Sequence, residues 1–249
     1  MSVVDQLYRA YHGGPLLSRV EVGVESLEQA YDVQEQLVEK EEKQGNPLAG
    51  YKISLTSSET QDLFGATEPL YGALLKDSIA NNVVEINTLR EPLIEVELMF
   101  LIDSQIDSDD DETTILDKTR IAPGIEIPDS RYEDWFPKLA LNQIVMDRAV
   151  AGKVVVGEVQ EGLTKADLND LTVHVFLDHQ LLVTGTSEDV MGNPLNAVKW
   201  LVDALARNGQ HLEAGMVVSS GTFMLPKQLE KGVYRADFER IGQVQVEIV

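Results

Sequence analysis

The segment EPLIEVELMFLI, residues 91–102, places two acidic residues inside an otherwise apolar strand. Side chains alternate between the two faces of a strand, and both faces of this segment are mainly apolar, as in a strand that is buried on both sides. Glu95 and Glu97 nevertheless fall next to each other on one of these faces. Two buried carboxylates repel each other and lose their hydration. A chain with this strand must therefore supply a compensating positive charge.

A third acidic residue has a similar setting. In RIAPGIEIPDSR, Glu126 lies between two isoleucines in a second short apolar stretch. Three carboxylates from two strands can surround one divalent cation, and an all-oxygen ligand set favours Mg²⁺ or Mn²⁺ over zinc. We therefore predict that Glu95, Glu97 and Glu126 bind one such cation. The pattern leaves open a solvent-facing pair on an edge strand, and also a carboxylate pair that cleaves a glycosidic bond.

Composition narrows the class of protein. A chain of 249 residues with 43% hydrophobic residues can bury a core as one large domain or two small ones. It contains no cysteine, which excludes disulfides and cysteine zinc sites, and no signal peptide or membrane-spanning segment is visible. These features fit a cytoplasmic protein. The net charge of -22 repels nucleic acid and anionic membranes, so we expect neither as a partner, and an anionic substrate needs local positive charge at the site.

Other metal and nucleotide motifs are missing from the sequence. No two histidines have a metal-binding spacing, and no phosphate-binding loop, nucleophile elbow or dinucleotide fingerprint occurs. The acidic run DSQIDSDDDE, residues 103–112, lacks the glycine and the distal glutamate of a calcium loop. We expect it to be a solvated loop that leads into a helix, whose N-terminus favours negative charge.

The hydrophobic patterns predict an α+β chain. Helices are expected from Ser26 to about residue 44, over residues 57–64, and from Asn193 to about residue 208. A short strand is expected at GYKISLT, and strands dominate after residue 90: 92–102, 121–127, 152–157, 171–177, 181–185, 215–219, 233–238 and 243–249. This shift places a predicted boundary between a small α/β part, residues 1–85, and a larger sheet-rich part, residues 86–249, that carries the metal site.

Seven segments, in order and with the right spacing, resemble the 2-keto-4-pentenoate hydratases and the related 4-oxalocrotonate decarboxylases of the fumarylacetoacetate hydrolase superfamily. They cover nearly the whole chain and read GYKISLTS, PLYGALLKD, PLIEVELMFLI, IAPGIEIPDSRYEDW, GNPLNAVKWLVDALARNG, LEAGMVVSSG and RADFERIGQVQVEI. The resemblance implies a mixed β-sandwich roll with a small α/β N-terminal part. It also implies a homo-oligomer, in some cases associated with a related decarboxylase or hydratase, and short 2-oxo acids or their enols as substrates.

The resemblance also assigns roles to residues. It implies that Glu95, Glu97 and Glu126 hold Mg²⁺ or Mn²⁺. The lysine of the family's G-x-K-x-G-L-T segment matches Lys52, although Ser54 replaces a glycine, and the aspartate after Y-G-x-L matches Asp77. These two are the predicted catalytic residues, since a lysine and an aspartate can move protons beside a metal-held 2-oxo acid. The predicted substrate-binding residues are Leu55, Thr56, Ser220 and Gly221.

Several departures from the family pattern affect substrate choice. Val150 replaces a serine that many members carry, Asn193 replaces a histidine before the late helix, and SGTFMLP replaces the usual SGALGP. The favoured function is a hydratase that converts a 2-hydroxydienoate to a 4-hydroxy-2-oxo acid. The alternatives are a 4-oxalocrotonate-type decarboxylase, an acylpyruvate hydrolase, and a non-catalytic partner subunit. A decarboxylase needs groups for a second carboxylate, which Val150 and Met224 do not supply.

Overall fold

Strand β5 (Leu93–Ile102) lies inside the larger of two sheets in the computed structural model, which describes residues 1–20 and 23–249. The order of this sheet is β2-β1-β10-β5-β6-β7-β3, and β11 also pairs with β5. Its other strands are β1 (Leu48–Ser54), β2 (Leu70–Leu75), β3 (Ile79–Ala80), β6 (Thr119–Ile127), β7 (Lys153–Val156), β10 (Val217–Ser219) and β11 (Lys227–Gln228). The acidic strand is thus an inner strand, and the edge-strand alternative is wrong.

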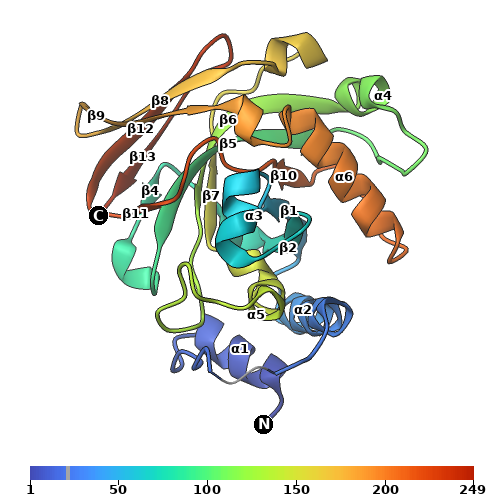
Figure 1. The fold of residues 1–249 in the computed structure, drawn as a ribbon, viewed down its shortest axis with the longest axis vertical. Coiled ribbons are helices and arrows are strands. Elements are labelled where there is room, and N and C mark those ends of the chain that lie inside the picture. The colour runs from blue at the N-terminus through green and yellow to red at the C-terminus, as the bar shows by residue number, and fades with distance from the viewer. Residues whose placement is uncertain (21–22) are drawn as a thin grey trace.

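A second sheet has five strands in the order β4-β13-β12-β8-β9. These are β4 (Val83–Val84), β8 (Thr172–Leu177), β9 (Gln180–Thr186), β12 (Gly232–Phe238) and β13 (Gly242–Ile248). In Figure 1 this sheet lies at the upper left, and β13 packs against β6 and β7 of the larger sheet. The apolar face of each sheet is turned toward the other, and the main hydrophobic core lies between them and under α6 (Pro194–Ala206). The predicted β-sandwich roll is confirmed.

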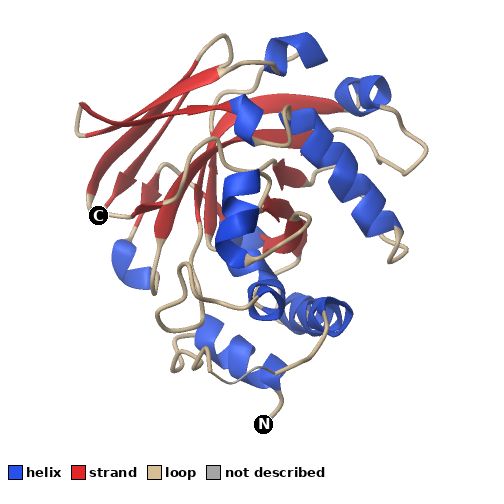
Figure 2. Cartoon of the chain, in the orientation of Figure 1, coloured by secondary structure: helices blue, strands red, loops and turns tan. Residues whose placement is uncertain are grey.

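Helices cover the remaining sides of the molecule, as Figure 2 shows. Helices α1 (Val3–Tyr11), α2 (Leu27–Glu42) and α5 (Leu141–Met146) share a second hydrophobic cluster near the N-terminus. Helix α3 (Ser58–Phe64) lies in front of β1 and β2 in Figure 1, and α4 (Glu112–Asp117) follows the acidic run. None of the helices in the described ranges is long and apolar enough to cross a membrane.

Local sequence explains where the predicted helices begin. The Ser26 hydroxyl accepts a hydrogen bond from the Gln29 N–H at the start of α2, and the Asn193 side chain accepts one from the Leu195 N–H at the start of α6. Asp111 does the same for the Thr114 N–H, which makes the end of the acidic run the cap of α4. The expectation of a loop that leads into a helix is confirmed.

The N-terminal elements are continuous with the sheet. Strands β1 and β2 belong to the same sheet as β5 and β6, and α2 packs against α5, which lies beyond residue 86. The division at residue 85 remains a prediction about folding units. For the site, the important consequence is that residues from both parts meet at the same end of the sheet.

Candidate functional site

Neighbouring positions on β5 and β6 bring three acidic side chains together. The antiparallel register places Glu126 opposite Glu95, and Glu97 follows on the same face of β5. One carboxylate oxygen from each residue lies within 4.8 Å of the other two. The exposed fractions of Glu95, Glu97 and Glu126 are 9%, 1% and 0%. The structure therefore gathers the three predicted metal ligands in the interior.

Their burial makes the charged form of these acids costly. Burial, followed by repulsion from Glu126, raises the pKa of Glu95 to about 8, and attraction to Lys52 opposes this rise. Burial and the charges of Glu126 and Glu95 raise the pKa of Glu97 well above its usual range. Oε2 of Glu126 has no hydrogen-bond partner among the described residues. The group therefore has more buried negative charge than its neighbours neutralise.

Glu97 is held in place by the segment that follows β10. The Ser219 hydroxyl donates a hydrogen bond to Oε2 of Glu97 at 2.5 Å, and the Gly221 N–H donates one to the same oxygen at 2.7 Å. Gly221 has a φ of +111°, and a Cβ there would lie 2.5 Å from the Thr56 side chain. A glycine is needed at this position for both reasons. The other oxygen of Glu97 is left for a different partner.

Lys52 projects into the same group from β1. It pairs with Gly72 on β2 and Ser219 on β10, its side chain is buried, and its Nζ forms an ion pair with Oε1 of Glu126. Burial acts to lower the pKa of Lys52, but the charges of the three glutamates outweigh it, so the pKa is raised. The neighbouring acids, rather than burial, therefore set the direction of the change in this pKa in the protein without metal. Lys52 is a cation in this setting.

A divalent cation fits this donor set. One lysine neutralises one of the three carboxylates, and the oxygens lie within 4.8 Å of one another. Two oxygens that bind one cation at about 2.0–2.6 Å can be no more than about 4–5 Å apart. The orphaned Oε2 of Glu126 and the free oxygen of Glu97 are available as ligands. The residues present therefore suit Mg²⁺ or Mn²⁺.

A small cavity of about 50 Å³ opens beside the carboxylates. Lys52, Glu95 and Glu97 line one side of it, together with Ser54, Thr60 and Thr222. The rest of its lining is apolar and comes from Ile53, Leu55, Phe64, Pro128, Trp135, Phe136, Ile144, Val150 and Pro226. The cavity thus has a charged floor on the sheet and an apolar wall on the helical side.

The predicted substrate-binding residues lie in different settings. Leu55, whose φ is +59°, lines the cavity. Thr56 lies behind Gly221 and accepts a hydrogen bond from the Met191 N–H through its carbonyl. Ser220 is buried, and its hydroxyl has no hydrogen-bond partner among the described residues. Gly221 donates its N–H to Glu97, so this N–H is already used within the protein.

The structure separates Asp77 from Lys52. Asp77 lies in the turn Lys76–Ser78 after the end of β2, and its side chain is exposed. Its N–H donates to Asn46, and its carbonyl accepts from Lys153. Lys52 instead pairs with Gly72, in the middle of β2. The two predicted catalytic residues therefore lie at different places on the strand pair, and Asp77 is left out of the site proposed below.

Sequence reasoning missed most of the apolar wall. Trp135 and Phe136 follow strand β6 in a loop, and Ile144 lies on α5, which the sequence patterns did not predict. The aromatic pair in YEDWFP was the available signal. Arg131, which also follows β6, pairs with a buried acid, since its Nε lies 2.7 Å from Oδ1 of Asp147.

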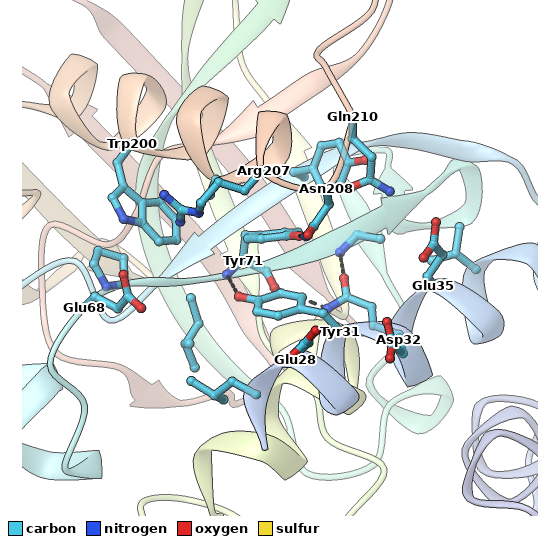
Figure 3. A pocket seen from close by; sticks show the side chains of 18 of the residues that line it. Glu28, Tyr31, Asp32, Glu35, Glu68, Tyr71, Trp200, Arg207, Asn208 and Gln210 are labelled. Carbon is cyan, nitrogen blue, oxygen red and sulfur yellow. Dashed lines mark hydrogen bonds between the residues drawn. The ribbon is translucent and has the colours of Figure 1, made fainter. Parts of the chain in front are cut away.

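A larger cavity, of about 580 Å³, lies elsewhere between α2 and α6. Figure 3 shows Tyr31 from α2 near Tyr71 from β2, and Trp200 from α6 on the opposite side. The rings of Tyr31 and Tyr71 stack with centroids 4.4 Å apart. The carboxylate cluster and Lys52 do not line this cavity. We therefore place the chemistry at the smaller cavity.

Comparisons with known proteins agree with this architecture. No protein-family model matches the chain. The chain is 32% identical to the TodF product hydratase of Pseudomonas putida, in a match that covers 87% of this chain and 82% of that protein. It is 29% identical to the 2-oxo-hept-4-ene-1,7-dioate hydratase of Escherichia coli (90% and 87% covered) and 30% identical to the 4-oxalocrotonate decarboxylase of a Pseudomonas species (77% and 74% covered).

Solved structures show the same fold. The 4-oxalocrotonate decarboxylase from Pseudomonas putida G7, complexed with magnesium and adipate, superposes with a TM-score of 0.90 at 24% identity, over 99% of this chain and 95% of that one. The fumarylpyruvate hydrolase from Pseudomonas aeruginosa, in complex with Mn²⁺ and pyruvate, gives a TM-score of 0.63 at 12% identity, over 82% and 91%. The fold is therefore that of the fumarylacetoacetate hydrolase superfamily. Within it, the chain belongs to the 2-keto-4-pentenoate hydratase and 4-oxalocrotonate decarboxylase family.

Proposed function

We propose that the protein is a metal-dependent hydro-lyase, which hydrates a 2-hydroxydienoate of the 2-keto-4-pentenoate type to a 4-hydroxy-2-oxo acid. The observation that carries the proposal is the buried group of three carboxylates and one lysine beside an apolar cavity. The relatives named as hydratases support the reaction type.

The proposed cofactor is Mg²⁺ or Mn²⁺, held by Glu95, Glu97 and Glu126. When bound, the cation supplies positive charge that stabilises the enolate form of a 2-oxo acid. The hydrogen bonds from Ser219 and Gly221 keep one oxygen of Glu97 fixed, so that its other oxygen points to the ligand position. The relatives complexed with magnesium and with Mn²⁺ support this choice of metals.

Lys52 is the proposed catalytic residue. Its buried ammonium group lies at the edge of the cavity and carries a positive charge that can stabilise a developing oxyanion. In the reaction, the enol proton leaves the 2-hydroxyl and a proton is added at C5, which moves the double bond to C3–C4. The water oxygen then bonds to C4 and a proton is added at C3. Lys52 is placed to exchange one of these protons.

The alternatives make different demands on the site. The family resemblance implies that an acylpyruvate hydrolase activates water with a histidine–glutamate pair, and no histidine lines this cavity among the described residues. A 4-oxalocrotonate-type decarboxylase shares the metal site and must also accept a second carboxylate. A non-catalytic partner subunit would show no turnover by itself. We also expect a homo-oligomer, which light scattering of the purified protein would detect.

Product analysis tests the proposal. The purified protein would be incubated with Mn²⁺ and, in separate reactions, with 2-hydroxypentadienoate, 4-oxalocrotonate and acetylpyruvate. We expect 4-hydroxy-2-oxopentanoate from the first substrate, and loss of this activity in Glu97→Gln and after chelation. Release of CO₂ from the second substrate at a higher rate would assign a decarboxylase. No metal-dependent turnover of any of the three would reject an enzymatic role on these acids.

A further inference from the structure

Three of the polar side chains that line the cavity already donate their hydrogens to other protein groups, whereas the Ser54 hydroxyl makes no side-chain hydrogen bond among the described residues. The indole N–H of Trp135 donates to the carbonyl of Glu91 at 2.9 Å. The Thr60 hydroxyl donates to the carbonyl of Ser57 at 3.0 Å, and that of Thr222 to the carbonyl of Met224 at 2.8 Å. Thr60 and Thr222 are therefore bonded to nearby backbone carbonyls, and Trp135 is bonded to the segment that precedes β5. They contribute apolar surface and leave few donors for an anionic group.

The buried cations near the wall already have other contacts. Arg131 binds Asp147, and its guanidinium lies 4.0 Å from the ring centre of Tyr11. Arg148 lies 4.2 Å from the same ring. Its Nε has no hydrogen-bond partner among the described residues, but its side chain does not line the cavity. A second carboxylate against this wall would thus lose its hydration without gaining a counter-charge, which is costly.

An unusual backbone turn fixes one part of the wall. Arg148, Ala149 and Val150 have φ values of +53°, +50° and +53°, a region that β-branched residues such as valine rarely adopt. Two contacts with neighbouring segments hold the backbone of this turn in place. A Cβ on Gly72 would lie 1.9 Å from the carbonyl oxygen of Arg148, and the carbonyl of Val150 accepts a hydrogen bond from the Asp129 N–H. Such strain is maintained where the position of a side chain matters.

We infer that the acid bound by this protein ends in an uncharged, apolar tail rather than in a second carboxylate, and that Val150 is the residue that sets this preference. This inference rests on the proposed function and deepens it. Val150 is buried, lines the cavity, and belongs to the same apolar cluster as Trp135 and Ile144. The preference separates this chain from its relative that hydrates 2-oxo-hept-4-ene-1,7-dioate.

Competing substrates provide the first test. We would measure kcat/KM with Mn²⁺ for 2-hydroxypentadienoate and for the enol form of 2-oxohept-4-ene-1,7-dioate. We expect a preference of at least about a hundredfold for the monocarboxylate, because an unpaired carboxylate must be buried with the other substrate. A similar or higher kcat/KM for the dioate would overturn the inference while the hydratase assignment stands. That result would point to Arg148, whose Nε has no hydrogen-bond partner among the described residues, as the group that accepts the second carboxylate.

A charge introduced at the wall provides the second test. Val150→Arg supplies a counter-charge, and Val150→Met is the matched control because it lengthens the side chain without charge. We expect Val150→Arg to shift the ratio of kcat/KM toward the dioate by at least about tenfold, and Val150→Met to leave that ratio within about threefold. Equal shifts in both variants, or no shift in either, would overturn the role of Val150.

Ligand binding to the unmodified protein keeps the inference testable if Val150→Arg does not fold. With Mn²⁺ bound, we expect 2-oxopentanoate to bind more tightly than 2-oxoadipate in calorimetry. Selective binding of 2-oxopentanoate without turnover of any dienoate would support the apolar tail and reject the hydratase. Binding of 2-oxoadipate with equal or greater affinity, or of neither acid, would overturn the inference.

Discussion

At the scale of single residues, Lys52 and the proposed cation share a partner. Lys52 is paired with Glu126 in the interior, and Glu126 is also a predicted metal ligand. In the protein without metal, Lys52 is, among the residues that the structure describes, the one cation that lines the cavity together with the carboxylates. In the metal-bound protein, the divalent metal ion adds two further positive charges. The importance of Lys52 for stability should therefore depend on whether metal is present.

Lys52→Met removes this charge and keeps the apolar part of the side chain. We expect kcat to fall by about two to four powers of ten, as for a lost acid–base group. Without metal, the variant should lose about 3–5 kcal/mol of unfolding free energy, because Glu126 stays buried without its partner. Saturating Mn²⁺ should restore most of that loss. Urea unfolding with EDTA and with Mn²⁺ measures both effects.

A matched control is the exposed Lys43, paired only with Glu39 on the surface of α2. Lys43→Met should change the unfolding free energy by less than about 0.5 kcal/mol with or without Mn²⁺. Near-normal turnover of Lys52→Met on the best substrate would contradict the catalytic role, and proton transfer would then belong to another group.

Glu95 gives the protein without metal an unusual response to pH. Its folded pKa is raised to about 8 by burial and by Glu126, while its unfolded pKa is ordinary, about 4.3. Between these values the folded state holds a proton that the unfolded state has lost. The unfolding free energy contributed by Glu95 should therefore fall as pH rises from about 5 to about 8. Metal affinity should rise over the same range, because binding requires release of this proton.

Glu95→Gln isolates this contribution, since glutamine does not titrate. The difference in unfolding free energy between Glu95→Gln and the unmodified protein, both in EDTA, should grow in favour of the variant between pH 5.5 and pH 8.5. A difference that is independent of pH would show that Glu95 titrates normally in the folded protein.

At the scale of elements, the local signals in the sequence were sufficient for most of the longer strands and for the long helices, whereas β2, β3, β4 and β11 were not predicted. All eight strands predicted after residue 90 occur within about three residues of their expected bounds, because alternation and burial leave a clear pattern. The three glutamates were predicted from the same strand pattern, whereas Lys52 was predicted from the family resemblance. Helices α1 and α5 were not predicted, since α5 has only six residues and is stabilised by tertiary packing.

The apolar wall could not be predicted because it is assembled from distant segments. Phe64, Trp135 and Val150 meet only after α3, the loop after β6 and the turn after α5 have packed together. Asp77 is the reverse case. A matched motif assigned it to the site, whereas the turn after β2 leaves its side chain exposed at the surface. Sequence spacing does not reveal which end of a strand pair a side chain faces.

Gly72 allows the turn Arg148–Val150 to lie against β2. Its own φ is not positive, so Gly72→Ala acts only through the contact with Arg148, where the added Cβ would lie 1.9 Å from a carbonyl oxygen. We expect a loss of at least about 3 kcal/mol in unfolding free energy, or failure to fold. Gly45→Ala is the control: it has a φ of +87° and open space, so about 1–2 kcal/mol of backbone strain is expected. Equal losses in both variants, measured by urea unfolding, would show that the close approach is unimportant.

At the scale of the whole molecule, the net charge of -22 acts against both folding and the binding of an anion. Such a protein gains stability from any cation that binds only its folded state. At a hundredfold excess over Kd, the gain is about 2.7 kcal/mol. The metal site should therefore be visible in the thermal stability of the whole chain.

Thermal unfolding with EDTA, with Mg²⁺ and with Mn²⁺ measures this gain. We expect Tm to rise by about 5 °C or more when metal replaces EDTA, on the usual scale of a few degrees per kcal/mol for chains of this size. Glu97→Gln should lose most of the rise, while Glu41→Gln, which removes a carboxylate near His12 outside the site, should keep it. A Tm that is indifferent to chelation and to added metal would contradict the proposed site.

The two sides of the cavity have separate origins, and this has a consequence for how such a protein can change over evolutionary time. The charged floor belongs to inner strands of a sheet, where almost any substitution disturbs the core. The wall comes from a short helix, a loop and a turn packed beneath the N-terminal helices. Mutations in the wall can therefore accumulate while the reactive groups stay fixed. Proteins with this arrangement can therefore change their substrate preference through a few substitutions in the wall, while the reaction that they catalyse stays the same.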